Sequence, residues 1–335
     1  MSRLRVAALL GALTAAGCAS SDAGPAQRPT FTNPVISSDF ADPDVVEGPD
    51  GWYAYATGVP GHSAIQVARS ADLVTWSEPE DALPQRPDWQ PLQDGLTWAP
   101  DVVPVDDGWR MYYVARHQGS GLQCLSTARA DDPGGPFVDD SEGPFLCQED
   151  LGGSIDPEVF RDEDGRTYLF WKNDGNAVGA DTRIWVCELG DDGVSLVGTP
   201  LDTGLVQTHP WQGALVEAPA VVAVEDGYVM FYSANDYGSE HYAMGYATAS
   251  SVTGPWTDRS PQPWVASAGP AAGPGGQTVV RVGGQTWLAY HAWDAGAVGY
   301  PAGRRAMWLD RIDWRDGEPV LRGPTATEQP VPGSD

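Results

Sequence analysis

The feature of this 335-residue chain that most constrains its fold is an internal repeat of about 57 residues. Each copy holds a two-residue turn signal, Asp-Gly or Gly-Gly, and then a strand-like run rich in aromatic residues. The second glycines of these signals are separated by 57, 57, 62 and 57 residues, at Gly51, Gly108, Gly165, Gly227 and Gly284. This regularity predicts five copies of one structural unit.

A second element recurs about eight residues before each turn. Four copies are closely similar, and the fifth, at 275–279, is degenerate. The four are Asp42-Pro43-Asp44-Val45, Ala99-Pro100-Asp101-Val102, Asp156-Pro157-Glu158-Val159 and Ala218-Pro219-Ala220-Val221. No stretch shows a sustained 3.6-residue apolar period, and one unit has room for about four short strands. We therefore predict an all-β fold, a five-bladed β-propeller with about four antiparallel strands per blade, over residues 31–323.

The two ends of the chain differ in composition from the repeats. Arg3 and Arg5 precede an apolar stretch, 4–16, that is too short to span a bilayer, which predicts an export signal over residues 1–18. The cleavage site resembles the lipoprotein type, with lipid on Cys18; plain cleavage nearby is the alternative. Residues 19–30 are interpreted as a linker and 324–335 as a polar tail. We expect an exported protein, either a cell-surface lipoprotein or secreted or periplasmic, with membrane contact only through Cys18.

Charge and cysteine content exclude several classes of function. The net charge of −27 would repel a phosphate backbone, so we expect no nucleic-acid partner. No Cys/His cluster has zinc spacing. Cys124 and Cys147 flank a turn-rich stretch, and export permits a disulfide, so these two are the expected pair and Cys187 the free thiol. We expect a monomer that requires no cofactor.

Three carboxylates break the repeat at the same phase. The first strand of each blade carries residues toward the central axis, and Asp42, Asp156 and Glu217 lie there in apolar contexts. One Asp-Pro alone is usually a turn or a strand cap, but three at one phase indicate a shared pocket. Such a pocket suits glycosidic bond hydrolysis, which needs one carboxyl as a base and another as an acid. Asp44 and Glu158, which follow the prolines, are interpreted as structural.

At these residues the chain resembles glycoside hydrolase family 43. The motifs that carry the resemblance are Asn33-Pro34-Val35, Ala41-Asp42-Pro43-Asp44, Trp98-Ala99-Pro100-Asp101, Gly153-Ser154-Ile155-Asp156-Pro157, Glu217-Ala218-Pro219 and Tyr290-His291-Ala292-Trp293. That family comprises five-bladed propellers, mostly arabinofuranosidases, arabinanases and β-xylosidases. The resemblance implies an inverting hydrolase that releases α-L-arabinofuranosyl or β-D-xylosyl units from plant cell-wall polysaccharide or oligosaccharides.

The resemblance also implies roles for single residues. Asp42 resembles the general base, Glu217 the general acid, and Asp156 the carboxylate that orients the acid and raises its pKa. Base and acid would lie about 6.5–9.5 Å apart, leaving room for a water molecule. Trp98 would shape a sugar subsite. His291 resembles the axial histidine that holds a cation such as calcium, or its water; a satisfied buried histidine is the alternative.

Further substrate contacts are expected around the pocket. Arg304 or Arg305 would contact the sugar or Asp156, with a solvated loop arginine as the alternative. Trp171 and Asn235 are further candidates for substrate binding. The stretches 85–96 and 202–214 are candidate rim loops, and their tryptophans, Trp89 and Trp211, are either platforms for the rest of the substrate or core residues.

One departure from the family pattern leaves substrate and metal open. Gly276 stands where many arabinanase-type members carry a histidine in a Gly-Pro-Gly-His motif. A second hypothesis is a non-catalytic, carbohydrate-binding surface propeller, which would not need all three carboxylates. Their joint presence favours the enzyme.

Overall fold

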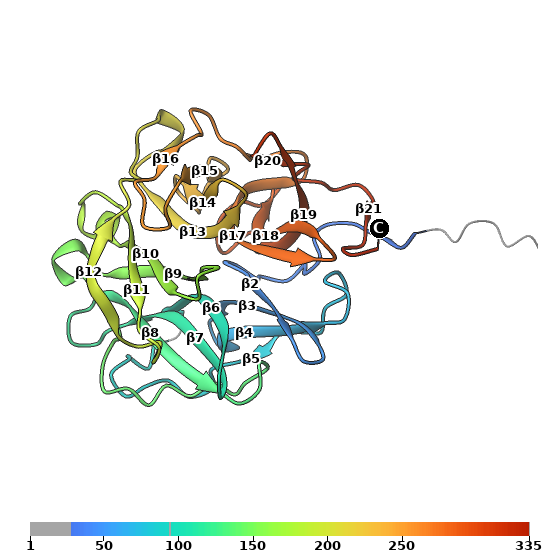
Figure 1. The fold of residues 1–335 in the computed structure, drawn as a ribbon. Helices are drawn as coiled ribbons and strands as arrows, with labels where there is room; N and C mark the ends of the chain where they lie inside the picture. Colours follow the sequence, from blue (N-terminus) through green and yellow to red (C-terminus); the bar gives the residue numbers. More distant parts are fainter. Residues whose placement is uncertain (1–27, 94, 335) are drawn as a thin grey trace, which may run out of the picture.

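The protein is a ring of five β-sheets around a central axis (Figure 1). The computed structural model describes residues 28–93 and 95–334. In the described residues, four of the five sheets have four strands and the second has three, all antiparallel. The predicted five-bladed β-propeller is therefore confirmed.

The five blades follow one another in order along the chain. In each blade the first strand lies nearest the axis (Figure 1). Blade 1 comprises β2 (Asp44–Gly48), β3 (Gly51–Val59), β4 (Ser63–Ser70) and β5 (Glu80–Asp81). Blade 2 comprises β6 (Thr97–Val105), β7 (Gly108–Arg116) and β8 (Gln123–Ala130). Blade 3 comprises β9 (Ser154–Arg161), β10 (Thr167–Asn173), β11 (Ile184–Leu189) and β12 (Leu196–Asp202).

The last two blades have the same order. Blade 4 comprises β13 (Val216–Val224), β14 (Gly227–Ala234), β15 (Ala243–Ala249) and β16 (Thr257–Asp258). Blade 5 comprises β17 (Ala271–Val282), β18 (Gln285–Asp294), β19 (Arg305–Arg315) and β20 (Glu318–Leu321). Within residues 28–93 and 95–334, three short 3-10 helices lie in loops, at Glu149–Leu151, Gly175–Val178 and Pro210–Gln212.

The repeated glycines form the tight hairpins between the first two strands of the blades. Gly108, for example, has φ of +130°, and a Cβ there would lie 2.4 Å from the carbonyl oxygen of Ala130. Only glycine fits that conformation and that space. The strand that follows each turn supplies the apolar and aromatic residues of the core.

The hydrophobic core is divided among the five interfaces between neighbouring blades. The interface of blades 1 and 5, for example, contains Phe40, Trp52, Trp287 and Met307, all buried. Comparable clusters lie between blades 1 and 2, 2 and 3, 3 and 4, and 4 and 5. Burial of both faces of each sheet explains why the strands read as nearly continuous apolar runs.

The first strand of every blade bends at one residue with a left-handed backbone. The five residues occupy the same repeat position, with φ between +41° and +58°: Asp42, Ala99, Asp156, Ala218 and Gly276. In blades 2 to 5 the ladder shifts register at this point. In four blades proline follows, which cannot donate a ladder hydrogen bond. The bend directs side chains out of the sheet and toward the axis.

Buried carboxyl groups just after the bends tie each blade to the next. Asp44 accepts a hydrogen bond from the amide of Val102 in blade 2 (2.8 Å), and Asp101 accepts one from Val159 in blade 3 (3.1 Å). Glu158 accepts one from Val221 in blade 4 (3.0 Å). These contacts agree with the structural interpretation of Asp44 and Glu158.

The two ends of the described chain meet at blade 5 (Figure 1). β1 (Thr30–Phe31) pairs with β21 (Gln329–Pro330), and Gln329 is buried. The segment 324–334, which the sequence assigned to a polar tail, is therefore attached to the propeller. The predicted export signal, 1–18, and most of the predicted linker lie outside the described residues. Within the described part, no helix is long and apolar enough to cross a membrane.

A disulfide fastens the long loop that follows β8. Cys124 in β8 is bonded to Cys147, and the neighbouring Leu125 forms a bridge with Leu146. Cys187 is free and buried. The predicted pairing is confirmed.

Candidate active site

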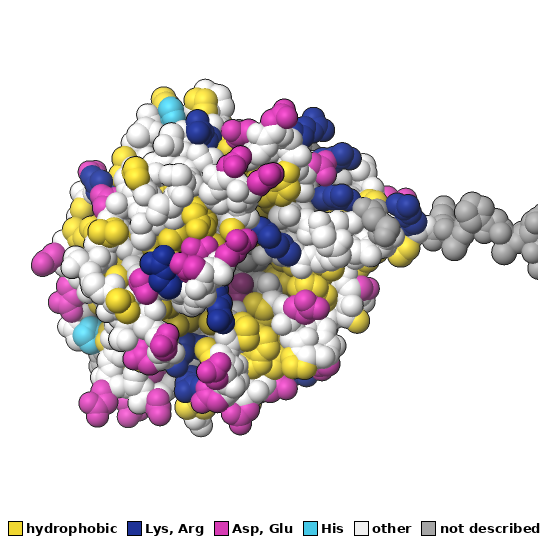
Figure 2. Space-filling view, in the orientation of Figure 1, with side chains coloured by type: hydrophobic (Ala, Val, Ile, Leu, Met, Phe, Trp, Pro, Cys, Tyr) yellow, Lys and Arg dark blue, Asp and Glu magenta, His cyan; other side chains and the backbone are white. Residues whose placement is uncertain are grey.

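A cavity of about 540 Å³ opens at the propeller axis. Its walls include Asp42, Trp98, Asp156, Glu217 and Arg305, which come from all five blades or the segments that lead into them. Figure 2 shows acidic and basic side chains beside apolar ones around the centre of this face. The size and the mixed lining are typical of a small-molecule site. The three carboxylates predicted from the repeat therefore share one pocket.

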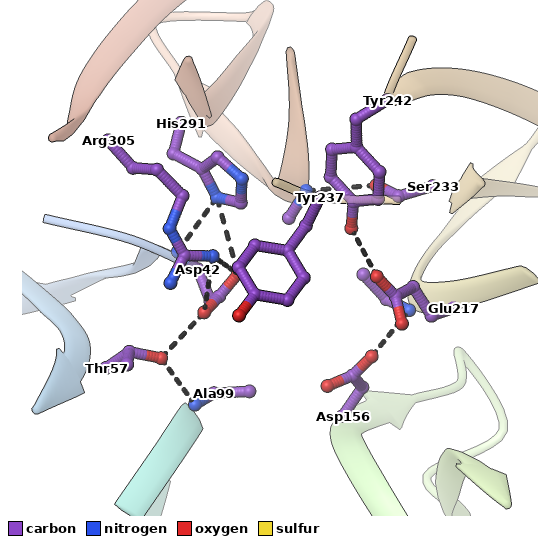
Figure 3. A network of polar contacts seen from close by, with 12 residues as sticks. Asp42, Thr57, Ala99, Asp156, Glu217, Ser233, Tyr237, Tyr242, His291 and Arg305 are labelled. Atoms are coloured by element: carbon purple, nitrogen blue, oxygen red, sulfur yellow. Dashed lines mark hydrogen bonds and ion pairs between the residues drawn. The ribbon is translucent and has the colours of Figure 1, made fainter. Parts of the chain in front are cut away.

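Asp42 lies on one side of the pocket, held by donors on several sides (Figure 3). Thr57 donates its hydroxyl to Oδ2 (2.6 Å), and the Arg305 guanidinium lies 3.4 Å from Oδ1. Burial opposes ionisation, but the positive charge of Arg305 and the hydrogen bonds outweigh it and hold the pKa of Asp42 below its ordinary value. Because of this lowered pKa the carboxylate of Asp42 is ionised. The side chain is 24% exposed, so the carboxylate is also open to the pocket.

His291 stands behind Asp42 and is completely buried. The amide of Asp42 donates to His291 Nδ1 (3.1 Å), and burial lowers the pKa of the imidazole, so the ring is neutral. His291 Nδ1 also lies 3.3 Å from Asp42 Oδ1, so it can accept from that amide or donate to that carboxylate, while Nε2 has no partner among the described residues. His291 thus positions the backbone of Asp42, and its burial rules out the predicted contact with substrate.

Gly276 is required by this packing. A Cβ there would lie 2.7 Å from Asp42 Oδ1 and 2.7 Å from the His291 ring. The histidine that many arabinanase-type relatives would carry at this position cannot coexist with this arrangement of Asp42 and His291.

The residues around His291 do not form a cluster of ligands for a cation. Nε2 of the neutral ring offers a lone pair to a metal only when the ring proton lies on Nδ1. Among the described residues, no group of three or more His, Cys, Asp or Glu side chains could hold a metal ion. The buried Nε2, which has no partner in the described part of the chain, suits a contact with a water molecule.

Glu217 lies on the opposite side of the pocket from Asp42, between Tyr242 and Asp156 (Figure 3). Tyr242 donates its hydroxyl to Oε1 (2.7 Å), and the Lys172 ammonium lies 2.9 Å from Oε2. Lys172 is almost completely buried, and neighbouring carboxylates raise its pKa against the effect of burial, so it stays charged. Glu217 is therefore oriented by two fixed partners.

Asp156 lies beside Glu217 and has the opposite electrostatic environment to Asp42. Its Oδ2 accepts the amide of Ala218 (3.0 Å), the residue after Glu217. Burial and the negative charge of Glu217 raise the pKa of Asp156 to about 8. At neutral pH the Asp156 carboxyl therefore holds a proton, while Asp42 does not.

An aromatic group surrounds the Arg305 guanidinium. The rings of Tyr237, Trp293 and Tyr300 lie 4.9, 5.9 and 5.8 Å from its central carbon. Arg304 is exposed, so Arg305 is the arginine of the pocket, and it contacts Asp42 rather than Asp156. Trp98 lines the pocket and donates its indole N–H to the carbonyl of Gly95 (2.9 Å).

Four other predicted substrate contacts lie outside the pocket. Trp171 is fully buried and donates to Gln148 (2.7 Å), because the strand turns its side chain into the interface of blades 2 and 3. Asn235 binds the carbonyl of Trp211 (2.8 Å) in its own loop. Trp89 packs in the core between blades 1 and 2, and Trp211 stacks on Tyr232. The burial of Trp171 contradicts its predicted contact with substrate, Asn235 is not among the residues that line the pocket, and Trp89 and Trp211 follow the core alternative.

Several pocket residues were missed by sequence reasoning. Lys172 carried a signal, since it is a charged residue at the end of an aromatic strand run. Tyr237 and Tyr300 are 47% and 51% exposed and line the pocket, from loops rich in Gly and Asp. Thr57 and Tyr242 gave no signal, because only the folded blades bring them to Asp42, 15 residues away in sequence, and to Glu217, 25 residues away.

The fold and the pocket define a class, a five-bladed propeller with convergent carboxylates. The sequence profile of glycosyl hydrolases family 43 matches residues 31–319. The chain belongs to this family of glycosidases.

Individual relatives are named for different glycosidase activities. The chain is 24% identical to the extracellular endo-α-(1→5)-L-arabinanase 1 of Bacillus subtilis over 331 residues, covering 92% of this chain and 95% of that one. It is 26% identical to a β-D-galactofuranosidase of Aspergillus niger over 238 residues, 67% of this chain and 65%, just under two thirds, of that relative. The crystal structure of a thermostable family-43 glycoside hydrolase matches with a TM-score of 0.80 and 29% identity, covering 90% of this chain and 99% of that one.

Proposed function

We propose that this protein is an inverting glycosidase that releases α-L-arabinofuranosyl or β-D-xylosyl units from plant polysaccharide or oligosaccharides. Asp42 is the general base, Glu217 the general acid and Asp156 the modulator of the acid. The observation that carries the proposal is the contrast across one pocket. Asp42 is kept ionised by Arg305, whereas Asp156, beside Glu217, is kept protonated.

The reaction needs one displacement at the anomeric carbon. Asp42 takes a proton from a water molecule, whose oxygen attacks the sugar as the glycosidic bond breaks. Glu217 gives its proton to the leaving oxygen, so the two carboxyl groups exchange protonation states in each turnover. Asp156 and Glu217 are neighbouring carboxyl groups whose like charges repel, so the pair keeps a proton at neutral pH, and this proton serves Glu217 as the acid.

The substrate is proposed from the relatives as well as from the pocket. The B. subtilis relative is named for arabinan, and the A. niger relative for a galactofuranosyl unit, so furanosyl sugars are the first group to test. The β-D-xylosyl alternative rests on the sequence resemblance.

The test is hydrolysis of p-nitrophenyl α-L-arabinofuranoside, β-D-xyloside and β-D-galactofuranoside, with Glu217→Gln as the matched variant. We expect turnover of at least one substrate and a loss of about 10²-fold or more in the variant with poor leaving groups, because the amide cannot supply the proton. Absence of turnover on these substrates and on arabinan and xylan oligosaccharides, with undiminished sugar binding in the variant, would favour the carbohydrate-binding propeller instead.

Export through residues 1–18 is also part of the proposal. The name of the B. subtilis relative and the disulfide between Cys124 and Cys147 support it. Mass spectrometry of the chain recovered from its native cells is expected to find residues 1–17 removed. An intact N-terminus would contradict export by this route.

A further inference from the structure

Lys172 occupies an unusual place at the axial end of β10. The preceding residues of this strand are aromatic and buried, and the ladder with β9 shifts register between Phe170 and Lys172. After the shift Lys172 pairs with Ile155, next to the bend at Asp156. Its ammonium therefore reaches the wall of the pocket while its side chain is only 1% exposed.

The contacts of Lys172 constrain the proton of Glu217. Lys172 Nζ lies 2.9 Å from Glu217 Oε2 and 3.7 Å from Asp174 Oδ1. An ammonium group can donate but cannot accept, and an unprotonated oxygen is the stronger acceptor, so this contact favours the proton of Glu217 on the other oxygen. Tyr242, which contacts Oε1, has a hydroxyl that can donate or accept. Oε1 is therefore the oxygen that can carry the acid proton.

We propose that Lys172 is a positioning residue for Glu217, which fixes the carboxyl group through Oε2, leaves Oε1 to carry the proton, and sets the upper pH limit of catalysis. This inference rests on the proposed role of Glu217 as the general acid. Lys172 and an ionised Asp156 act on Glu217 in opposite directions, because the positive charge favours the carboxylate of Glu217 and a neighbouring negative charge favours its acid form.

The charged and titratable groups near Glu217 come from four directions, and together they decide its protonation. They are Lys172 and Asp174 at the end of β10, Asp156 at the start of β9, Tyr242 before β15, and Asp42 across the pocket. Lys172 is the positive charge in direct contact with Glu217, and Asp174 partly neutralises it. Removal of either one therefore changes the balance in a known direction.

The experiment compares the pH dependence of kcat/KM for the wild type, Lys172→Met and Asp174→Asn. Methionine keeps most of the length of the lysine without its charge, so Glu217 holds its proton to higher pH. The alkaline limb is expected to move up by about 1–2 pH units. Asn at position 174 leaves Lys172 less neutralised, so the alkaline limb is expected to move down by a smaller amount. A role limited to packing would move neither limb.

Each outcome bears on a separate claim. Shifts of opposite sign in the two variants support the inference. A wild-type alkaline limb that depends on Glu217 but does not move in either variant overturns it and leaves the proposed function standing. Absence of wild-type turnover overturns both. Thermal unfolding of each variant shows whether it is folded. If Lys172→Met does not fold, the test rests on Asp174→Asn. An alkaline limb that does not move down in that variant is then sufficient to overturn the inference.

Discussion

At the scale of single residues, one left-handed position in each blade decides what that blade contributes to the pocket. A non-glycine residue there costs about 1–2 kcal/mol, and four blades carry one. In blades 1 and 3 the residue is an aspartate whose side chain enters the pocket, Asp42 or Asp156. In blade 5 it is Gly276, because His291 and Asp42 fill the space that a side chain would need.

Gly276→Ala tests this crowding, with Gly284→Ala as the matched control. Both glycines have positive φ, +58° and +77°, but a Cβ at Gly284 meets nothing within 4 Å. The control is expected to lose about 1 kcal/mol of unfolding free energy and keep its activity. Gly276→Ala is expected to lose about 2–4 kcal/mol and about tenfold or more in kcat/KM, since it displaces Asp42. Urea unfolding and aryl-glycoside kinetics measure both, and equal behaviour of the two variants would contradict the packing argument.

At the scale of elements, the segment before blade 1 closes the ring against the third strand of blade 5. Asn33 accepts the amide of Leu309 in β19 (2.8 Å) and donates to the carbonyls of Leu309 (2.9 Å) and Thr325 (3.1 Å). Val35 and Phe40 add backbone hydrogen bonds to Met307 and Arg305 (2.9 and 2.7 Å). The N-terminal segment thus joins the first blade to the last.

Asn33→Ala is expected to weaken this closure. It removes the hydrogen bonds of the Asn33 side chain and leaves the buried amide of Leu309 in β19 without its partner, which costs about 2–3 kcal/mol of unfolding free energy. The exposed Gln262→Ala is the control and is expected to change stability by less than about 0.5 kcal/mol. Urea denaturation measures both variants. Identical midpoints would show that β1 and the residues after it do not carry the closure.

At the scale of the whole molecule, a group of buried carboxyls around the axis couples blade packing to pH. Burial raises the pKa of Asp44 to about 7 and that of Glu158 to about 8, and burial with neighbouring carboxylates raises that of Asp101 well above its ordinary value. The folded protein therefore binds more protons here than the unfolded chain does. Their contribution to stability is complete below the unfolded pKa, falls as pH rises, and is lost above the folded pKa.

Glu158→Gln is expected to reduce this dependence. Glutamine keeps an acceptor for the amide of Val221 but cannot titrate, so the decline of unfolding free energy between about pH 4.5 and 8 becomes shallower by at most about 1.4 kcal/mol per pH unit. Glu163→Gln, at an exposed position, removes the same charge and is expected to leave the slope unchanged. Urea unfolding at several pH values measures the slopes. The same slope in both variants would show that the axial carboxyl does not titrate on unfolding.

The sequence by itself determined the number of blades, the turns between their strands and the three carboxylates of the pocket. All of these depend on local patterns repeated along the chain, and repetition makes a weak local signal strong. The pairing of Cys124 with Cys147 was also accessible, because the two residues flank one loop.

The tertiary structure alone decided which neighbours of the carboxylates reach the axis. Trp171 and Lys172 are adjacent in β10 and point to opposite faces, so a shift of one residue exchanges the residue in the core for the residue in the pocket. That shift arises from the bulge opposite Asp156 in β9, a pairing between strands that the sequence pattern of β10 does not record. Likewise, the contact of His291 with Asp42 joins blade 5 to the segment before blade 1, so it exists only once the ring has closed.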